Sequence, residues 1–287
     1  MGKKTSSMKR KKTVISIVSH VILTILSAIW VSPLVALIIT SLRKERTSDR
    51  TYLWPKDGFT LNNYRDLFID TDPLNYPQWI ANTFIVAVFT CLISTFMVLS
   101  VAYTMSRLRF KMRKSFMNVA LILGMFPGFM SMIAIYLMFS IFELNGTLTG
   151  LVVAYSAGAG AGFFVAKGFF DTIPKSIDEA ACIDGASKWT VFTKISLPLS
   201  KPIIVYQVFT SFMAAWTDFI LVAILQGDNV GKYTVAKGLY TMLERDYINL
   251  YFTRFCAGSV LISIPLIILF IAMQKCYTEG VAGAVKG

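Results

Sequence analysis

Charged residues are scarce in this sequence, and apolar residues are abundant. Asp, Glu, Lys and Arg make up only 15% of the 287 residues, whereas 55% are apolar. A soluble domain usually carries about 25% charged residues. There is too little charge to cover a water-facing surface, so most apolar side chains must face lipid or other membrane spans. The net charge of +12 would suit a nucleic-acid binder, but the basic residues lie between long apolar runs, which excludes that class.

The sequence also lacks the residue clusters of a catalytic or metal site. Its four cysteines are scattered without a C-x-x-C pair, and His20 is the only histidine. A membrane enzyme would need clustered His, Asp or Ser residues, and there is no such cluster. The closest match to an ATP-binding Walker A loop, residues 227–233, is one residue short and has Tyr233 where Ser or Thr would hold magnesium. We therefore expect no catalytic residue, no metal and no cofactor on this chain.

Six long apolar runs predict an all-α membrane protein with six transmembrane helices. Residues 13–42 contain no charged side chain, and this run is longer than the roughly 20 residues that cross a bilayer. The first span should therefore tilt or bend, with Pro33 as the expected position. The preceding basic residues would also suit a signal peptide, but the apolar segment is about twice too long for one. The other runs are residues 79–103, 116–142, 147–166, 202–226 and 255–273, and Pro127 and Pro265 interrupt two of them.

The charges between these spans predict the orientation of the chain. Six spans place both termini on one side, and that side carries 18 Lys and Arg residues against 10 on the other. Basic residues accumulate on the cytoplasmic side, so both termini should be cytoplasmic. The expected organisation is a basic cytoplasmic tail (1–12), the first transmembrane helix (13–42), an external segment (43–77), a core of five helices (78–273) and a second cytoplasmic tail (274–287).

The longest cytoplasmic connection, residues 171–201, has the pattern of two short helices. Ser176 and Glu179 predict a capping box at the start of the first helix, and Gly185 suits its end. A second helix over residues 188–195 should stop at Leu197-Pro198. These patterns predict a rigid platform beneath the bilayer. Composition alone would also allow an interfacial helix that lies on the membrane.

The same segment resembles the inner-membrane component of binding-protein-dependent ABC importers. That family carries the pattern E-A-A-x3-G-x9-I-x-L-P here, and this sequence matches all seven fixed positions at the right spacing. The resemblance implies the transmembrane domain of a type I importer, whose coupling helix docks into a groove on a separate ATPase subunit. ATP and magnesium would bind to that partner. The expected ATPase-coupling residues are Glu179, Ala180, Ala181, Asp184, Gly185, Ile195, Leu197 and Pro198.

Segments near both ends resemble the MalG-type subunit of maltose and maltodextrin importers. These segments are Trp54-Pro55, residues 59–64 and residues 283–287. The resemblance implies a bacterial cell-membrane protein that works with a second homologous permease, two ATPase subunits and an extracellular sugar-binding protein. It implies import of maltose or maltodextrin, while raffinose-like and other oligosaccharides stay open. Many relatives have Asn where this chain has Thr217, so a polar contact of that Asn is not carried over.

Two further regions are candidates for function. Asp218 is the one acid inside a predicted span, and intramembrane carboxylates often line a pathway. We therefore weigh Asp218 and the nearby Trp216 as pathway residues against a helix-packing role.

The external loop of residues 227–253 mixes balanced charges with aromatic residues, which suits a protein contact. From the resemblance we expect the binding protein to contact Tyr240, Glu244 and Tyr247.

A secondary transporter or channel is the alternative class. Such a protein predicts paired broken helices or several charges inside the membrane. Asp218 is the only such charge in the predicted spans, which favours the importer subunit.

Overall fold

A computed structural model describes residues 2–45, 54–158 and 162–284 of the chain. The described residues form helices and connections, with a single bridging backbone pair between Arg43 and Phe59. The helices of the first half are α1 (Gly2–Ser41), α2 (Asn62–Ile69), α3 (Tyr76–Arg107), α4 (Arg113–Gly124), α5 (Gly128–Ile141) and α6 (Leu148–Gly158). Those of the second half are α7 (Phe163–Thr172), α8 (Lys175–Ile183), α9 (Lys188–Thr190), α10 (Leu197–Leu199), α11 (Lys201–Thr217), α12 (Ile220–Gln226), α13 (Val235–Thr241) and α14 (Ile248–Ala284).

The predicted all-α membrane fold is confirmed, whereas the count of six spans stays a prediction. Among the described residues, three helices are long and apolar enough to cross a bilayer: α1 from Lys12, α3, and α14 up to Gln274. Three further helix pairs reach that length and composition only together. The bends within them are 99° between α4 and α5, 45° between α6 and α7, and 59° between α11 and α12. Length and composition therefore allow between three and six spans.

The prolines act differently from one another. Pro33 and Pro265 lie inside α1 and α14, and both helices continue through them. The interruption expected at Pro265 is therefore wrong. Pro127 instead precedes α5 in an extended conformation, at the sharpest of the three bends. The residue before a proline avoids the helical conformation, which ends α4 ahead of this point.

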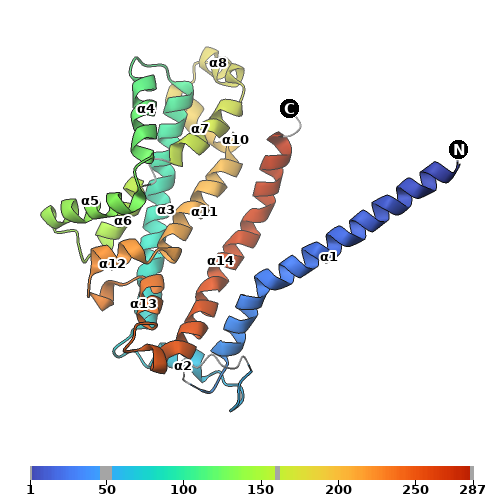
Figure 1. The fold of residues 1–287 in the computed structure, drawn as a ribbon. Coiled ribbons are helices and arrows are strands. Elements are labelled where there is room, and N and C mark those ends of the chain that lie inside the picture. The colour runs from blue at the N-terminus through green and yellow to red at the C-terminus, as the bar shows by residue number, and fades with distance from the viewer. Residues whose placement is uncertain (1, 46–53, 159–161, 285–287) are drawn as a thin grey trace.

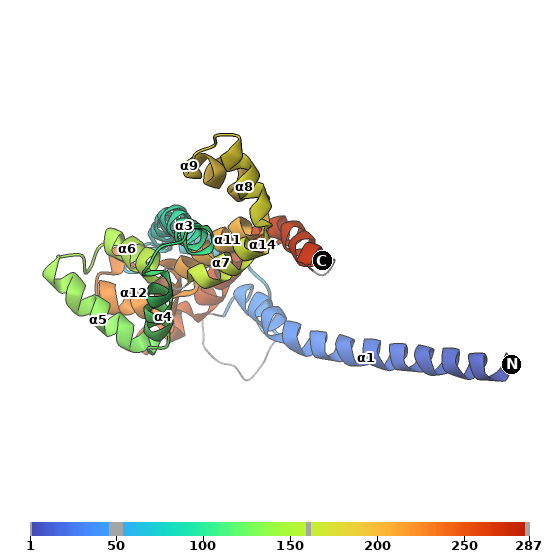
Figure 2. The same cartoon turned by 90° about the horizontal axis from the view of Figure 1, so that it is seen from above.

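Helix α3 is the central element of the bundle. It packs against α11, α7 and α6, and its first turns also contact α13 (Figure 1). The α8–α10 loop and the start of α4 lie at one end of the molecule, and α2 and α13 lie at the other. Helix α1 contacts α14 but then leaves the bundle, as Figure 2 shows from above. Its apolar side chains are exposed over most of its length, so lipid or another chain must cover them.

Candidate functional site: the coupling loop and a membrane cavity

The first helix of the loop, α8, begins differently from the sequence prediction. The predicted capping box at Ser176 and Glu179 is wrong, because α8 already starts at Lys175 and Pro174 is its N-cap residue without a side-chain cap. Proline has a fixed φ that suits a helix start, so the chain enters the helix two residues earlier than expected. Asp178 remains in the first turn, where its charge suits the helix dipole.

The end of α8 agrees with the prediction. Gly185 has a φ of +86°, which favours glycine over any residue with a Cβ atom. The Ala186 amide donates to the Ala181 carbonyl at 2.9 Å, and the Gly185 amide donates to the Cys182 carbonyl at 3.1 Å. This pair of hydrogen bonds is a Schellman motif, which ends the helix and turns the chain sharply.

The second part of the loop is longer than predicted. Ser187 caps α9 by accepting a hydrogen bond from the Thr190 amide at 3.1 Å. The chain then continues through a π-helical stretch, η2 (Val191–Ser196), into α10. The predicted stop at Leu197-Pro198 is wrong, because Pro198 lies in the first turn of α10, where its missing N–H is not needed.

The loop presents an exposed surface at the end of the molecule. Ile183 is 86% exposed and Trp189 is 62% exposed, which is unusual for large apolar side chains. Of the predicted coupling residues, Glu179, Ala180, Asp184, Gly185 and Pro198 are exposed, and Ala181, Ile195 and Leu197 are half-buried. The structure therefore leaves most of these residues open to a partner.

Three residues that the sequence analysis did not single out attach this loop to α3. Arg107 Nη2 donates to the Ile173 carbonyl at 2.8 Å, and its Nε lies 3.1 Å from Asp178 Oδ2. Ser106 donates to Asp171 Oδ1 at 2.5 Å. Arg107 entered the sequence analysis only as one of many basic residues, because sequence spacing gives no signal for a contact across about 70 positions.

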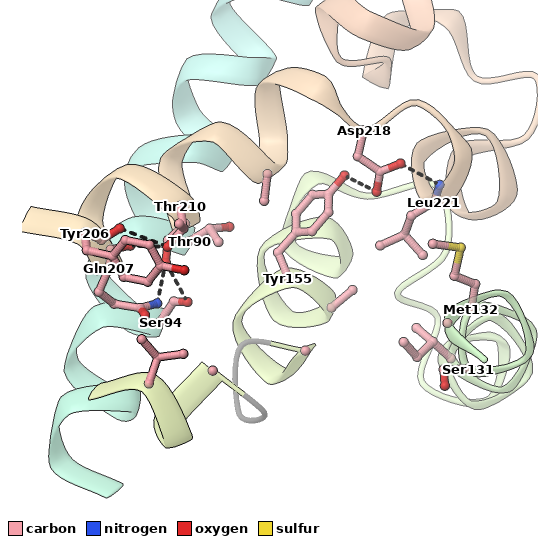
Figure 3. Close-up of a pocket in the computed structure, with 18 residues that line it drawn as sticks. Thr90, Ser94, Ser131, Met132, Tyr155, Tyr206, Gln207, Thr210, Asp218 and Leu221 are labelled. Atoms are coloured by element: carbon pink, nitrogen blue, oxygen red, sulfur yellow. Dashed lines mark hydrogen bonds between the residues drawn. The ribbon is translucent and has the colours of Figure 1, made fainter. Parts of the chain in front are cut away.

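A cavity of about 480 Å³ lies within the helical bundle, between α3, α5, α6 and α11 (Figure 3). Most of its lining surface is apolar, and the hydroxyl and amide side chains among the lining residues are Thr90, Ser94, Ser131, Tyr155, Tyr206, Gln207, Thr210 and Ser211. Gln207 donates to Ser211 at 2.8 Å, and Ser211 donates to Ser94 at 3.3 Å, so α11 and α3 share a chain of polar contacts. Among the described residues that line the cavity, Asp218 is the single charged one.

Asp218 lies at the break between α11 and α12. Its Oδ1 accepts from the amides of Ile220 and Leu221 at 2.8 and 3.2 Å, so the carboxylate caps α12. Its Oδ2 accepts from the Tyr155 hydroxyl at 3.1 Å, which links this break to α6 (Figure 3). Asp218 thus makes helix-packing contacts and also lines the cavity, while its role in a transport pathway stays a prediction. Trp216 is 3% exposed, stacks on Phe212 and does not line the cavity.

The three candidates for a binding-protein contact lie at the opposite end from the coupling loop. Tyr240 on α13 is 46% exposed and stacks on Phe219 at 4.7 Å between ring centroids. Glu244 is exposed and pairs with Lys237 at 3.1 Å. Tyr247 is half-buried against Tyr251. Tyr240 and Glu244 are accessible to a partner, while Tyr247 is less so.

Comparison with known proteins defines the class. Residues 99–281 match the family described as the binding-protein-dependent transport system inner membrane component. A galactooligosaccharide transport permease from Bacillus subtilis (GanQ) is 33% identical over 98% of this chain and 99% of its own length. A maltodextrin permease from Streptococcus pneumoniae (MalD) is 31% identical over the same shares. A chain of a bacterial ABC transporter involved in alginate import has the same fold, with a TM-score of 0.76 and 21% identity over 93% of this chain and 97% of its own.

The chain therefore belongs to the binding-protein-dependent transport system inner membrane component family. The resemblance to MalG-type permeases is confirmed, since several of these permeases are 30–32% identical to it. The chain is the membrane-spanning, non-catalytic permease subunit of an ABC importer, and the ATPase is a separate chain. Broken helix pairs are present, so this feature does not separate the importer from the alternative class of secondary transporters, and the family match decides between them.

Proposed function

We propose that this permease subunit imports an uncharged oligosaccharide, of the maltodextrin or galactooligosaccharide type. The relatives that match over nearly the whole chain carry the names of such sugars. The cavity supports the proposal, because hydroxyl and amide groups suit the hydroxyls of a neutral sugar. No Lys or Arg is among the described residues that line it, so an acidic polysaccharide would find no counter-charge there.

ATP hydrolysed on partner subunits drives this import. The exposed residues of α8 dock into an ATPase groove, where Ala180 and Gly185 allow close approach and Ile183 supplies an apolar contact. Closure of the ATPase pair moves the loop, and the loop moves the helices that line the cavity. A second permease, two ATPase subunits and an extracellular sugar-binding protein complete the transporter. This chain contributes the coupling surface and half of the pathway.

In the proposed orientation, which follows from the distribution of basic residues, the coupling loop and both termini lie in the cytoplasm. A cysteine at Lys114 or Ser187 should be shielded from impermeant thiol reagents in intact cells, and one at Asn229 should react. Labelling of the Ser187 position from outside would contradict this orientation.

The function is tested by reconstituting the complete transporter with its binding protein in vesicles. Uptake of maltodextrins and galactooligosaccharides of several lengths is compared with uptake of an acidic oligosaccharide, with and without ATP. We expect ATP-dependent uptake of neutral sugars only. Uptake without ATP would indicate a secondary transporter, and preferred uptake of the acidic sugar would contradict the argument from the cavity.

A further inference from the structure

The end of α3 at residues 103–107, which is its inner end in the proposed orientation, carries a buried cation. The Arg107 side chain is only 4% exposed, and its partner Asp178 is 14% exposed. Water screens such a pair little, so loss of either partner would leave an uncompensated buried charge. Arg107 also holds the Ile173 carbonyl at 2.8 Å, just before α8 begins. One side chain thus contacts both the entry to the coupling helix and its first turn.

Neighbouring side chains of the same end reach the rest of the loop. Ser106 donates to Asp171 at the end of α7. The Tyr103 ring packs on Phe170 of α7 and on Phe192 of η2, at 5.8 and 4.7 Å between ring centroids. The last turn of α3 therefore contacts α7, α8 and η2 together.

The coupling helix has little else to hold it. Within the described residues, α8 contains no buried residue. Apolar packing therefore contributes little to its position. Helix α8 also contacts η2, where Ser196 donates to Asp178 Oδ1 at 3.5 Å, and Lys188 donates to Cys182 at 3.2 Å. The ion pair to Arg107 and the turn at Gly185 add to these contacts and orient the helix.

We propose that Arg107 is a positioning residue that fixes the coupling helix to α3, so that the two move as one body when the ATPase closes. Helix α3 runs unbroken from Tyr76 to Arg107, and its middle carries Thr90 and Ser94 of the cavity. A displacement of α8 therefore also moves the part of α3 that lines the cavity. The inference rests on the proposed docking of α8 on an ATPase subunit.

The first test measures the sugar transported per ATP hydrolysed in the complete reconstituted transporter. Arg107→Gln and Asp178→Asn should each lower this ratio about fivefold or more, in the usual range of coupling between sites, while the ATPase rate stays within about twofold. Arg107→Lys keeps a cation beside Asp178 and should retain at least about half of the parental ratio. Arg109→Gln removes the same charge from an exposed side chain two residues away and should match the parent.

The outcomes separate this inference from the proposed function. A parental ratio in Arg107→Gln, or an Arg107→Lys variant no better than Arg107→Gln, would overturn the role of the pair. A parent transporter that takes up no neutral sugar would instead contradict the proposed function.

A cross-link tests the attachment even if the point variants assemble poorly. Cysteines replace Ser106 and Asp171 in a chain whose four native cysteines are changed to alanine. Because the native side chains touch, oxidation should join the two cysteines. The joined transporter should keep at least about half of its uptake, because the cross-link only prevents relative motion between two parts that are proposed to move together. Failure to join, both on oxidation and with a short bifunctional thiol reagent, would contradict the contact. A cross-link that stops uptake until reductant is added would show that α3 and the loop must move apart.

Discussion

The two ends of α3 are held by different kinds of contact. At the outer end Trp79 is fully buried, and its indole donates to the Val230 carbonyl at 3.0 Å. Asn82 donates to the Tyr233 carbonyl at 2.9 Å, and Thr83 accepts from the Val235 amide at 2.7 Å. At the inner end, the Tyr103 ring packs on Phe170 and Phe192, and Arg107 adds its ion pair with Asp178.

This difference indicates that contacts within the chain complete the packing at the outer end, whereas the inner end exposes surface that a partner would cover. The outer end is closed by tight apolar packing and neutral hydrogen bonds within the chain, which are lost only by unfolding. The inner end combines a buried ion pair with exposed apolar residues such as Ile183. A buried ion pair fixes geometry more than it adds stability, which suits a contact that holds two helices in a fixed relative position while they move.

The largest effect is expected at the outer end, from Gly238→Ala. A Cβ atom at Gly238 would lie 2.2 Å from ring atoms of Trp79, and neither group has room to shift. Overpacking of this kind costs about 3 kcal/mol or more. The expected result is little folded protein in the membrane, measured by detergent-extracted yield and thermal unfolding. Gly124→Ala, where a Cβ would meet nothing within 4 Å, is the control, and equal yields of both variants would contradict the tight packing.

The second largest effect is expected at the inner end, from Gly185→Asp. This variant should insert normally into the membrane, but its affinity for the ATPase subunit should fall about tenfold, or by about 1.4 kcal/mol. A Cβ at Gly185 meets nothing within 4 Å in this chain, but the φ of +86° strains any side chain, so backbone strain at the end of α8 adds to crowding against a partner. Co-purification of the ATPase subunit measures the effect. Gly185→Asn tolerates the positive φ equally well and adds no charge, so it separates bulk from charge. Normal co-purification and normal transport of both variants would contradict the proposal that this motif docks on the ATPase subunit.

Local features of the sequence predicted much of the fold and the family. The apolar runs located the helices to within a few residues at α3, and the glycine at position 185 located the end of α8. The bends at Pro127 and Asp218 were harder, because a run of apolar residues looks the same whether the helix is straight or broken. The capping box failed since Pro174 starts the helix earlier.

The contacts that attach the loop could not be predicted from the sequence. Arg107 and Asp178 are far apart along the chain, and each alone resembles an ordinary solvated charge. Their pairing depends on how α3 and α7 pack, which is a tertiary property. The cavity could likewise not be predicted from the sequence, because its polar residues come from four helices that are far apart along the chain.

An intermediate effect is expected at Asp218, midway between the two ends. Asp218→Ala removes the cap of α12 and leaves the Tyr155 hydroxyl without its partner, at a cost of about 1–2 kcal/mol. Asp218→Asn keeps an oxygen for the cap and an amide for the hydroxyl, so it should behave like the parent. Transport rate and thermal stability are compared for both. A transport loss in Asp218→Asn at parental stability would show that the charge itself acts in the pathway.

The smallest effect is expected on the outer surface, where the binding protein would dock. Thr241 and Met242 are only 6% and 1% exposed, so replacing residues 241–247 together would unfold this part of the chain. Single exposed residues are therefore the better probes. Tyr240→Ala and Glu244→Gln should each raise the binding-protein concentration for half-maximal ATPase about threefold, because rim contacts contribute only about 0.2–1 kcal/mol.

Tyr240→Phe is the matched control for the outer surface, because it keeps the stacking on Phe219 and removes only the hydroxyl. Basal ATPase without binding protein should change little in all three variants, since the coupling loop lies at the other end of α3. Stimulation equal to the parent at both limiting and saturating binding protein would mean that these side chains only line the outer membrane interface. A loss of basal activity would instead show that the two ends of α3 are less independent than their contacts indicate.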